Sequence, residues 1–245
     1  MDMDKPRMFP RLVPRLVPRF IPRVIPRVIP RVVLGATALL MSVSAALPVS
    51  ANTTTSAFPG IFSTRTTQSS NIAMFPKWGG ALSRYFSERQ LTDASCTSTL
   101  FNQCHLTEWK EFLTSLKGKS KLSQVKAVNT YMNRQRYFTD PRNYGVKDYW
   151  ATPGQFFERN GDCEDYAIAK FMSLRALGFT NKEMRIVVLQ DMNLRVGHAI
   201  LVVHLDGQAL VLDNQVRSVV RAETIRHYRP IYSINEHNWW LHRRG

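Results

Sequence analysis

Cysteines, acidic side chains and long apolar runs are all scarce in this sequence, and each scarcity excludes a class of function. Only three of the 245 residues are cysteine, and no Cys-x-x-Cys or His-x-x-x-His spacing indicates a zinc site. Acidic residues number 18 against 33 Lys or Arg. The basic residues occur singly, however, without the aromatic-flanked clusters of a nucleic-acid interface. We therefore expect neither a zinc site nor a nucleic-acid partner.

The N-terminal segment, residues 1–51, is predicted to be an export signal with a long basic n-region. Pro-Arg recurs every four residues over residues 10–31, and proline at this density excludes helix and central strand. The apolar run at residues 32–47 is shorter than the roughly 20 residues that span a bilayer, and Val49-Ser50-Ala51 resembles a cleavage signature. An uncleaved membrane anchor is the alternative. Cleavage would give an exported protein with no stable membrane insertion.

Cysteine usage and charge are both compatible with export. Cys96 and Cys104 lie eight residues apart in a polar stretch and could pair as a disulfide, or remain two unpaired thiols. Cys163 is then left over, and a free thiol kept in an oxidising compartment hints at use. Residues 1–51 hold eight Lys or Arg and two Asp, which leaves +9 of the formal +15 on the remainder. That excess favours an acidic partner or an anionic surface.

The remaining chain is long enough for one domain with its own core. Residues 52–76, rich in Ser and Thr, are predicted to be a flexible leader, and residues 77–245 the domain. Helical spacing and capping residues predict helices at 78–90, 107–116 (capped by Thr107), 123–136 (begun by Ser123), after Thr152-Pro153, and at 222–228. Strand patterns predict strands at 184–190, 197–204, 208–213 and 216–220.

One stretch, Asn160-Gly161-Asp162-Cys163-Glu164-Asp165-Tyr166, places a thiol among three acids where a helix to Leu177 begins. A helix N-terminus favours a thiolate, but neighbouring carboxylates oppose it. A cation is therefore expected near the sulfur: an imidazolium, a metal ion or both. The alternative, a buried cysteine acting as a small apolar side chain, does not explain the flanking acids.

A predicted hairpin supplies the imidazole. Asp206-Gly207 is a turn signal, and with the turn centred on Leu205-Asp206 or one residue later, Asp213 faces His198 or the adjacent Ile200. In both registers the side chains of His198 and Asp213 lie on one face, roughly 5–8 Å apart at Cβ. The alternative is a structural core histidine.

Cys163, His198 and Asp213 together form a candidate catalytic triad of nucleophile, base and orienting carboxylate. The backbone N–H of Cys163 is one candidate donor to an oxyanion, and a side chain, of Trp150 or Gln155, is the second. A transglutaminase or an amidase would use the same triad with an amine or water as acceptor, and the sequence does not separate these acceptors. A non-catalytic calcium-dependent binding module would keep the acids without needing Cys163.

Five segments resemble the bacterial transglutaminase-like cysteine proteinases and occur in that family's order, between roughly Trp109 and Trp240. They lie at residues 148–153, 161–170, 174–178, 197–199 and 211–214, and the Gly-Asp-Cys-Glu-Asp-Tyr block is highly specific. The resemblance implies a papain-like α+β fold in which N-terminal helices, including the nucleophile helix, pack on an antiparallel sheet. The Pro-Arg leader has no counterpart in the family.

The resemblance also implies a periplasmic, calcium-dependent endopeptidase. Its substrate would be a large calcium-binding surface adhesin, cut near its N-terminus so that biofilm disperses, and an inner-membrane cyclic-di-GMP receptor would sequester it. Ca²⁺ would be held by Asp162, Glu164 and Asp165. Asp162 and Asp165 lie one helical turn apart and offer the hard oxygen ligands that Ca²⁺ prefers, whereas helical spacing points Glu164 away from them.

Overall fold

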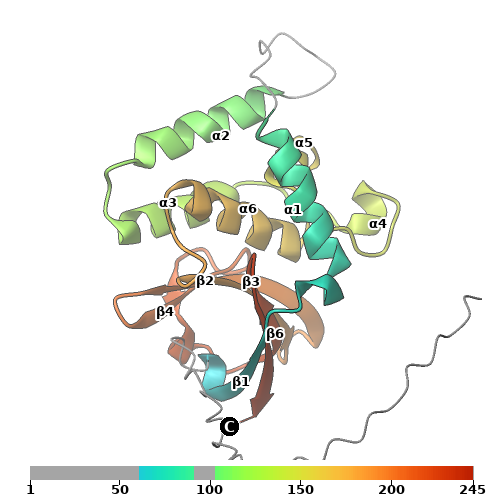
Figure 1. The fold of residues 1–245 in the computed structure, drawn as a ribbon, viewed down its shortest axis with the longest axis vertical. Helices are drawn as coiled ribbons and strands as arrows, with labels where there is room; N and C mark the ends of the chain where they lie inside the picture. The colour runs from blue at the N-terminus through green and yellow to red at the C-terminus, as the bar shows by residue number, and fades with distance from the viewer. Residues whose placement is uncertain (1–60, 91–102, 245) are drawn as a thin grey trace, which may run out of the picture. The chain divides into compact units, whose positions relative to one another are not determined.

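The computed structural model describes residues 61–90 and 103–244, which form a layer of helices packed on a seven-stranded antiparallel sheet (Figure 1). This is the α+β architecture that the family resemblance implied. No helix within the described ranges is both long and apolar enough to cross a bilayer. The predicted export signal, Cys96 and the side chain of Cys104 fall outside what the structure describes, so the signal and the disulfide stay predictions.

Within the described ranges, six α-helices precede the main part of the sheet: α1 (Pro76–Glu88), α2 (Gln103–Leu116), α3 (Lys121–Met132), α4 (Asp140–Asn143), α5 (Pro153–Arg159) and α6 (Cys163–Ala176). Two predicted starts are wrong. Thr107 lies inside α2, and α3 is capped by Ser120, whose hydroxyl accepts from the Ser123 N–H at 3.3 Å. Ser120 and Ser123 are equivalent as sequence signals, and only the non-helical backbone of Ser120 makes it the cap.

The predicted start of α5 is confirmed and sets the path of the chain toward Cys163. Thr152 accepts from the Gln155 N–H at 3.2 Å, and the Gln155 side chain accepts from the Thr152 N–H at 3.0 Å, which completes a capping box. Pro153 occupies the first turn, where its missing N–H costs nothing. α5 ends at Asn160, whose positive φ of 64° turns the chain directly into α6.

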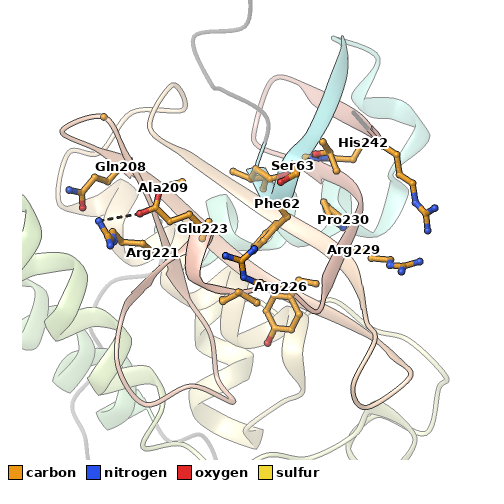
Figure 2. A pocket seen from close by; sticks show the side chains of 17 residues that line it. Phe62, Ser63, Gln208, Ala209, Arg221, Glu223, Arg226, Arg229, Pro230 and His242 are labelled. Atoms are coloured by element: carbon orange, nitrogen blue, oxygen red, sulfur yellow. Dashed lines mark hydrogen bonds and ion pairs between the residues drawn. The ribbon is translucent and has the colours of Figure 1, made fainter.

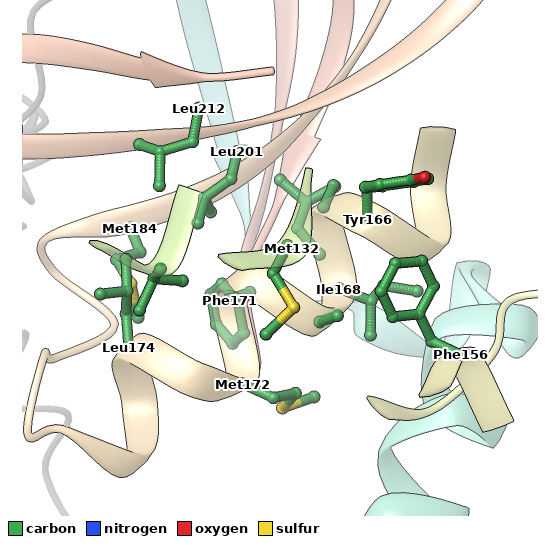
Figure 3. Packing of buried hydrophobic residues seen from close by; sticks show 14 of the residues in the cluster. Met132, Phe156, Tyr166, Ile168, Phe171, Met172, Leu174, Met184, Leu201 and Leu212 are labelled. Atoms are coloured by element: carbon green, nitrogen blue, oxygen red, sulfur yellow. The ribbon is translucent and has the colours of Figure 1, made fainter. Parts of the chain in front are cut away.

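α6 is the central helix of the core. It packs against β2 and β3 on one side and against α3 and α5 on the other. Its side chains Ile168, Phe171, Met172 and Leu174 are fully buried (Figure 3). A helix buried all round in this way is held by packing on every face, so its N-terminus is a fixed platform.

The strand order in the sheet is β1-β7-β6-β2-β3-β4-β5. The strands are β1 (Thr64–Ser69), β2 (Met184–Asp191), β3 (Val196–Leu205), β4 (Gln208–Leu212), β5 (Val220–Arg221), β6 (Tyr228–Ile234) and β7 (Trp239–Arg244). Leu201 pairs with Leu212, so the β3–β4 turn centres on Asp206-Gly207, the later of the two predicted registers. Both turn residues have positive φ, as this hairpin turn requires.

Residues 216–228 differ from their predicted structure. The predicted fourth strand is reduced to Val220–Arg221, and the predicted helix to one 3-10 turn, η3 (Ala222–Thr224). Tyr228 instead begins the central strand β6 opposite Asp191 of β2. Strand pairing therefore overrides the local helical pattern here.

The predicted flexible leader is wrong for its second half. Residues 64–69 form the edge strand β1, in which Gln68 lies opposite Trp240 of β7. The Thr64 hydroxyl contacts His242 Nδ1 at 2.8 Å, and the Gln68 side chain accepts from Trp240 Nε1 at 3.1 Å. A polar edge strand has the composition of a leader, because its stability comes from backbone pairing with β7 rather than from burial of apolar side chains.

Candidate active site

The N-terminus of α6 is built around Asp165. Its Oδ1 accepts from the Ala151 N–H at 2.7 Å, and its Oδ2 accepts from the Asp162 N–H at 3.2 Å. Gly161 is required beside it, since a Cβ there would lie 2.2 Å from Asp165 Oδ2. These contacts fix Asp162 as the N-cap and Cys163 as the first residue of the helix.

Cys163 is half-buried where α6 meets β3. Its Sγ donates to Glu164 Oε2 at 3.0 Å, and the backbone N–H of Ala199 in β3 donates to the sulfur. Burial, and then the negative charges of Glu164 and Asp162, raise the pKa of the thiol. A nucleophilic thiolate at this position therefore needs a base close by and something that offsets the negative charge of the acids.

His198 of β3 and Asp213, directly after β4, form a buried hydrogen-bonded pair. His198 Nε2 lies 2.9 Å from Asp213 Oδ1. Burial alone would raise the pKa of Asp213, but the hydrogen bonds from His198, Tyr228 and the Gln215 N–H outweigh it and hold that pKa below its usual range. Asp213 is therefore a carboxylate that accepts from Nε2–H, which leaves His198 Nδ1 as the basic nitrogen.

Tyr228 completes the pair, and sequence reasoning missed it. Its hydroxyl donates to Asp213 Oδ2 at 2.6 Å, and its ring lies edge-on to the His198 ring with the centroids 5.9 Å apart. Both oxygens of Asp213 are thus fixed. Tyr228 fell within the helix predicted at residues 222–228, so no sequence signal placed it behind Asp213.

The elements that carry the three candidate catalytic residues converge at one place. α6 brings Cys163 against β3, and the backbone N–H that faces its sulfur belongs to Ala199, the residue after His198. The β3–β4 hairpin then brings Asp213 to His198. Chemically, the arrangement offers a thiol, an imidazole whose Nδ1 is the basic nitrogen, and an ionised carboxylate that orients the imidazole.

The two side chains predicted to complete an oxyanion site have structural partners. The Gln155 amide closes the α5 capping box and donates to the Tyr149 hydroxyl at 2.8 Å. Trp150 is buried, with its ring 6.2 Å from that of Trp78. Their oxyanion role stays a prediction. The N–H of Cys163, in the first turn of α6, has no intrahelical acceptor and is a geometrically available donor.

Acidic side chains gather beside the thiol, and they include two that sequence reasoning did not select. Ligand oxygens of Asp140, Asp162 and Asp165 lie within 4.8 Å of one another, as do those of Asp140, Asp148 and Glu164. Asp140 lies 23 residues before Cys163 and Asp148 lies 15 residues before it, and these separations offer no ligand spacing to recognise.

The acidic cluster is better suited to holding a cation than to keeping its own negative charges close together without one. Asp140 Oδ1 and Asp162 Oδ1 are buried and accept no hydrogen bond from any residue in the described ranges. Burial, and then neighbouring acids, raise the pKa of Asp162 to about 8; burial and the charges of Asp162 and Asp148 raise that of Asp140 to about 6. Clustered carboxylates with orphaned oxygens are the donor set of a hard cation such as Ca²⁺.

Both the sequence and the fold of this chain are similar to known proteins. The family model described as bacterial transglutaminase-like cysteine proteinase (BTLCP) matches residues 94–243. A search of curated proteins found no match. Among solved structures, Legionella pneumophila LapG is 32% identical with a TM-score of 0.52, and the alignment covers 57% of this chain and 78% of LapG.

Two further LapG structures from Legionella pneumophila also align. A form treated with EGTA is 32% identical with a TM-score of 0.52, covering 57% of this chain and 76% of that one. A calcium-bound form is 28% identical with a TM-score of 0.53, covering 64% and 84%. The similarity thus extends over most of each LapG chain.

Proposed function

This chain belongs to the bacterial transglutaminase-like cysteine proteinases, and on that premise we propose that it is an exported, calcium-dependent cysteine endopeptidase using Cys163, His198 and Asp213. The observation that carries the proposal is the buried 2.9 Å hydrogen bond between His198 and Asp213, located where β3 meets the residue that begins α6. A buried imidazole–carboxylate pair beside a thiol is the arrangement that nucleophilic acyl transfer requires.

We infer one step for each residue. His198 Nδ1 takes the proton of the Cys163 thiol, and the thiolate attacks the carbonyl carbon of the scissile peptide. His198 then gives that proton to the leaving amine, and a water molecule activated by the same nitrogen hydrolyses the thioester. Asp213 holds Nε2–H, so that Nδ1 stays the basic nitrogen, and it stabilises the imidazolium. The Cys163 N–H donates to the developing oxyanion.

Calcium fits the acidic cluster. Asp140 and Asp162, each with one buried oxygen that has no hydrogen-bond partner among the described residues, would hold the ion together with Glu164. Asp165 contributes less, since both of its oxygens already accept from backbone N–H groups, and Asp148 is paired with Lys77. A bound Ca²⁺ would offset the negative charge that opposes the Cys163 thiolate. The calcium-bound form of LapG supports the choice of metal.

Removal of calcium is therefore expected to inactivate the enzyme. EGTA should lower cleavage of a protein substrate by about 10-fold or more, since the uncompensated acids then act on the thiolate, and added Ca²⁺ should restore it. Asp140→Asn and Asp162→Asn should each raise the Ca²⁺ concentration needed for half-maximal activity. Glu111→Gln, which alters an exposed acid of α2 that is not among the clustered acids, is the matched control. Full activity after exhaustive chelation would contradict the metal proposal.

We further propose that the substrate is a large calcium-binding adhesin secreted to the cell surface and cut near its N-terminus, which would disperse biofilm. An inner-membrane cyclic-di-GMP receptor is the proposed inhibitor. The supporting likeness is to LapG. The test is to express the chain in the periplasm of cells that display such an adhesin and to follow calcium-dependent release into the medium. Mass spectrometry of the cut ends would reveal an amine adduct if the acceptor were an amine instead of water.

Tyr228→Phe is expected to slow catalysis without unfolding the protein. The change keeps the ring and removes one hydrogen bond to the Asp213 carboxylate, so kcat/KM should fall by about 10-fold. Loss of that donor raises the pKa of Asp213, and the acidic limb of the pH profile should move to higher pH. Tyr232→Phe, in the same strand, is the control. An unchanged rate and an unchanged profile would show that Tyr228 only fills space.

A further inference from the structure

The face of the sheet opposite the helices holds a cavity of about 820 Å³ (Figure 2). Both ends of the strand order contribute to its lining, through Thr64 of β1 and Arg221 of β5, so the sheet curls around it. Buried apolar side chains on this side, among them Ile61, Ala222 and Tyr228, form a core cluster with no member from the six helices. The cavity is therefore separate from the interface between α6 and β3 that holds Cys163.

The rim of the cavity is strongly basic. Arg226, Arg229 and Arg244 line it, are exposed, and form no ion pair with any described residue. Arg221 also lines it but is paired with Glu223 at 3.1 Å, and Glu223 is the one acid in the lining. Three guanidinium groups that pair with no described carboxylate are thus concentrated around one opening.

Part of the cavity wall is apolar. Phe62, Ile225 and Tyr228 line it, and the rings of Phe62 and Tyr228 meet edge to face with centroids 5.8 Å apart. An occupant must therefore offer both carboxylates for the rim and apolar groups for the wall. A free inorganic anion satisfies only the first requirement, whereas a peptide that carries acidic and apolar side chains satisfies both.

We propose that this cavity is an exosite that binds an acidic, partly apolar segment of the protein substrate. The proposal rests on the endopeptidase function for the identity of the occupant, though not for binding itself. A polypeptide suits the geometry because β1 and β5 are the edges of the sheet, and an edge strand presents backbone groups on which an extended peptide can pair. Planar guanidinium groups engage carboxylates in bidentate fashion.

Tyr228 joins the exosite to the catalytic residues. Tyr228 lines the cavity, while its hydroxyl donates to Asp213 Oδ2 at 2.6 Å. A segment in the cavity therefore contacts the residue that fixes the orienting carboxylate. Tyr228 is thus shared by the proposed exosite and the candidate catalytic residues.

Binding is tested with the full chain carrying Cys163→Ala, so that the result does not depend on catalysis. The probe is a short fluorescein-labelled peptide of alternating Glu and Val, followed by fluorescence anisotropy, with a Lys and Val peptide as its charge control. Combined Arg226→Gln and Arg229→Gln changes should weaken binding of the Glu peptide by about 10-fold or more. Arg134→Gln, an exposed arginine beyond the end of α3, should leave it unchanged.

Several outcomes would overturn the exosite. These are equal affinity in the double variant, equal binding of the Lys peptide, or displacement of the Glu peptide by an equimolar amount of inorganic phosphate, which would indicate a site for free anions. In the active enzyme, the double variant should raise KM for an acid-containing protein substrate and leave kcat unchanged. If the Glu peptide binds but the wild-type chain cleaves no protein substrate, the endopeptidase proposal fails and the exosite stands.

Discussion

Cys163→Ala should reduce peptide-bond cleavage to background, a loss on the order of 10⁴-fold or more, since no acyl-enzyme can form without the thiol. The substitution removes one thiol group at a half-buried position, and α6 is held by packing on all faces, so the fold should persist. Cleavage of a protein substrate, followed on gels and by product mass, measures the effect.

The matched measurements separate chemistry from folding. Calcium binding by titration calorimetry and the thermal unfolding midpoint should be close to those of the wild-type chain, because Asp140 and Asp162 are untouched. Cleavage at the wild-type rate by Cys163→Ala would refute the nucleophile assignment. An inactive variant that also loses calcium binding would point to a damaged site instead.

Asp213→Asn should lower kcat by about 10⁴-fold while leaving the hairpin intact. The amide of Asn can donate to His198 Nε2, which favours the tautomer with a proton on Nδ1 and leaves no base for the thiol. The lost negative charge also removes the partner of the imidazolium. Single-turnover kinetics on a thioester or peptide substrate would isolate the acylation step.

Asp206→Asn is the appropriate control, because it makes the same chemical change at the exposed turn of the same hairpin. Its kcat should stay within a few-fold of the wild-type value. If Asp213→Asn also retained nearly full activity, His198 would need another orienting group, and the triad proposal would fail at its third member.

Where the local sequence already satisfies its own hydrogen bonds, prediction and structure agree. The capping box at Thr152 closes within four residues, and the Asp206-Gly207 turn fixes the β3–β4 register, which brings Asp213 to His198. The prediction of a helix start failed where two equivalent capping residues lie close together. Ser120 and Ser123 are both good caps, and the choice between them depends on the backbone that leads into α3.

Only part of the acidic cluster beside the thiol could be predicted from the sequence. Asp162, Glu164 and Asp165 follow one another along the chain and were selected for that reason. Asp140 lies 22 residues before Asp162, and only the packing of α4 against the start of α6 gives the two carboxylates a common space. Asp165 meanwhile turned out to accept two backbone N–H bonds, a role that its sequence position did not reveal.

The sequence by itself determined the nucleophile, its base and orienting carboxylate as candidates, the helix-then-strand order and the family, because each depends on contacts close along the chain or on one specific motif. Only the tertiary structure decided that Tyr228 holds Asp213, that Asp140 joins the acids, that residues 64–69 form an edge strand, and that the curled sheet encloses a basic cavity. These features arise from pairing and burial between distant segments, whose free energy no local pattern records.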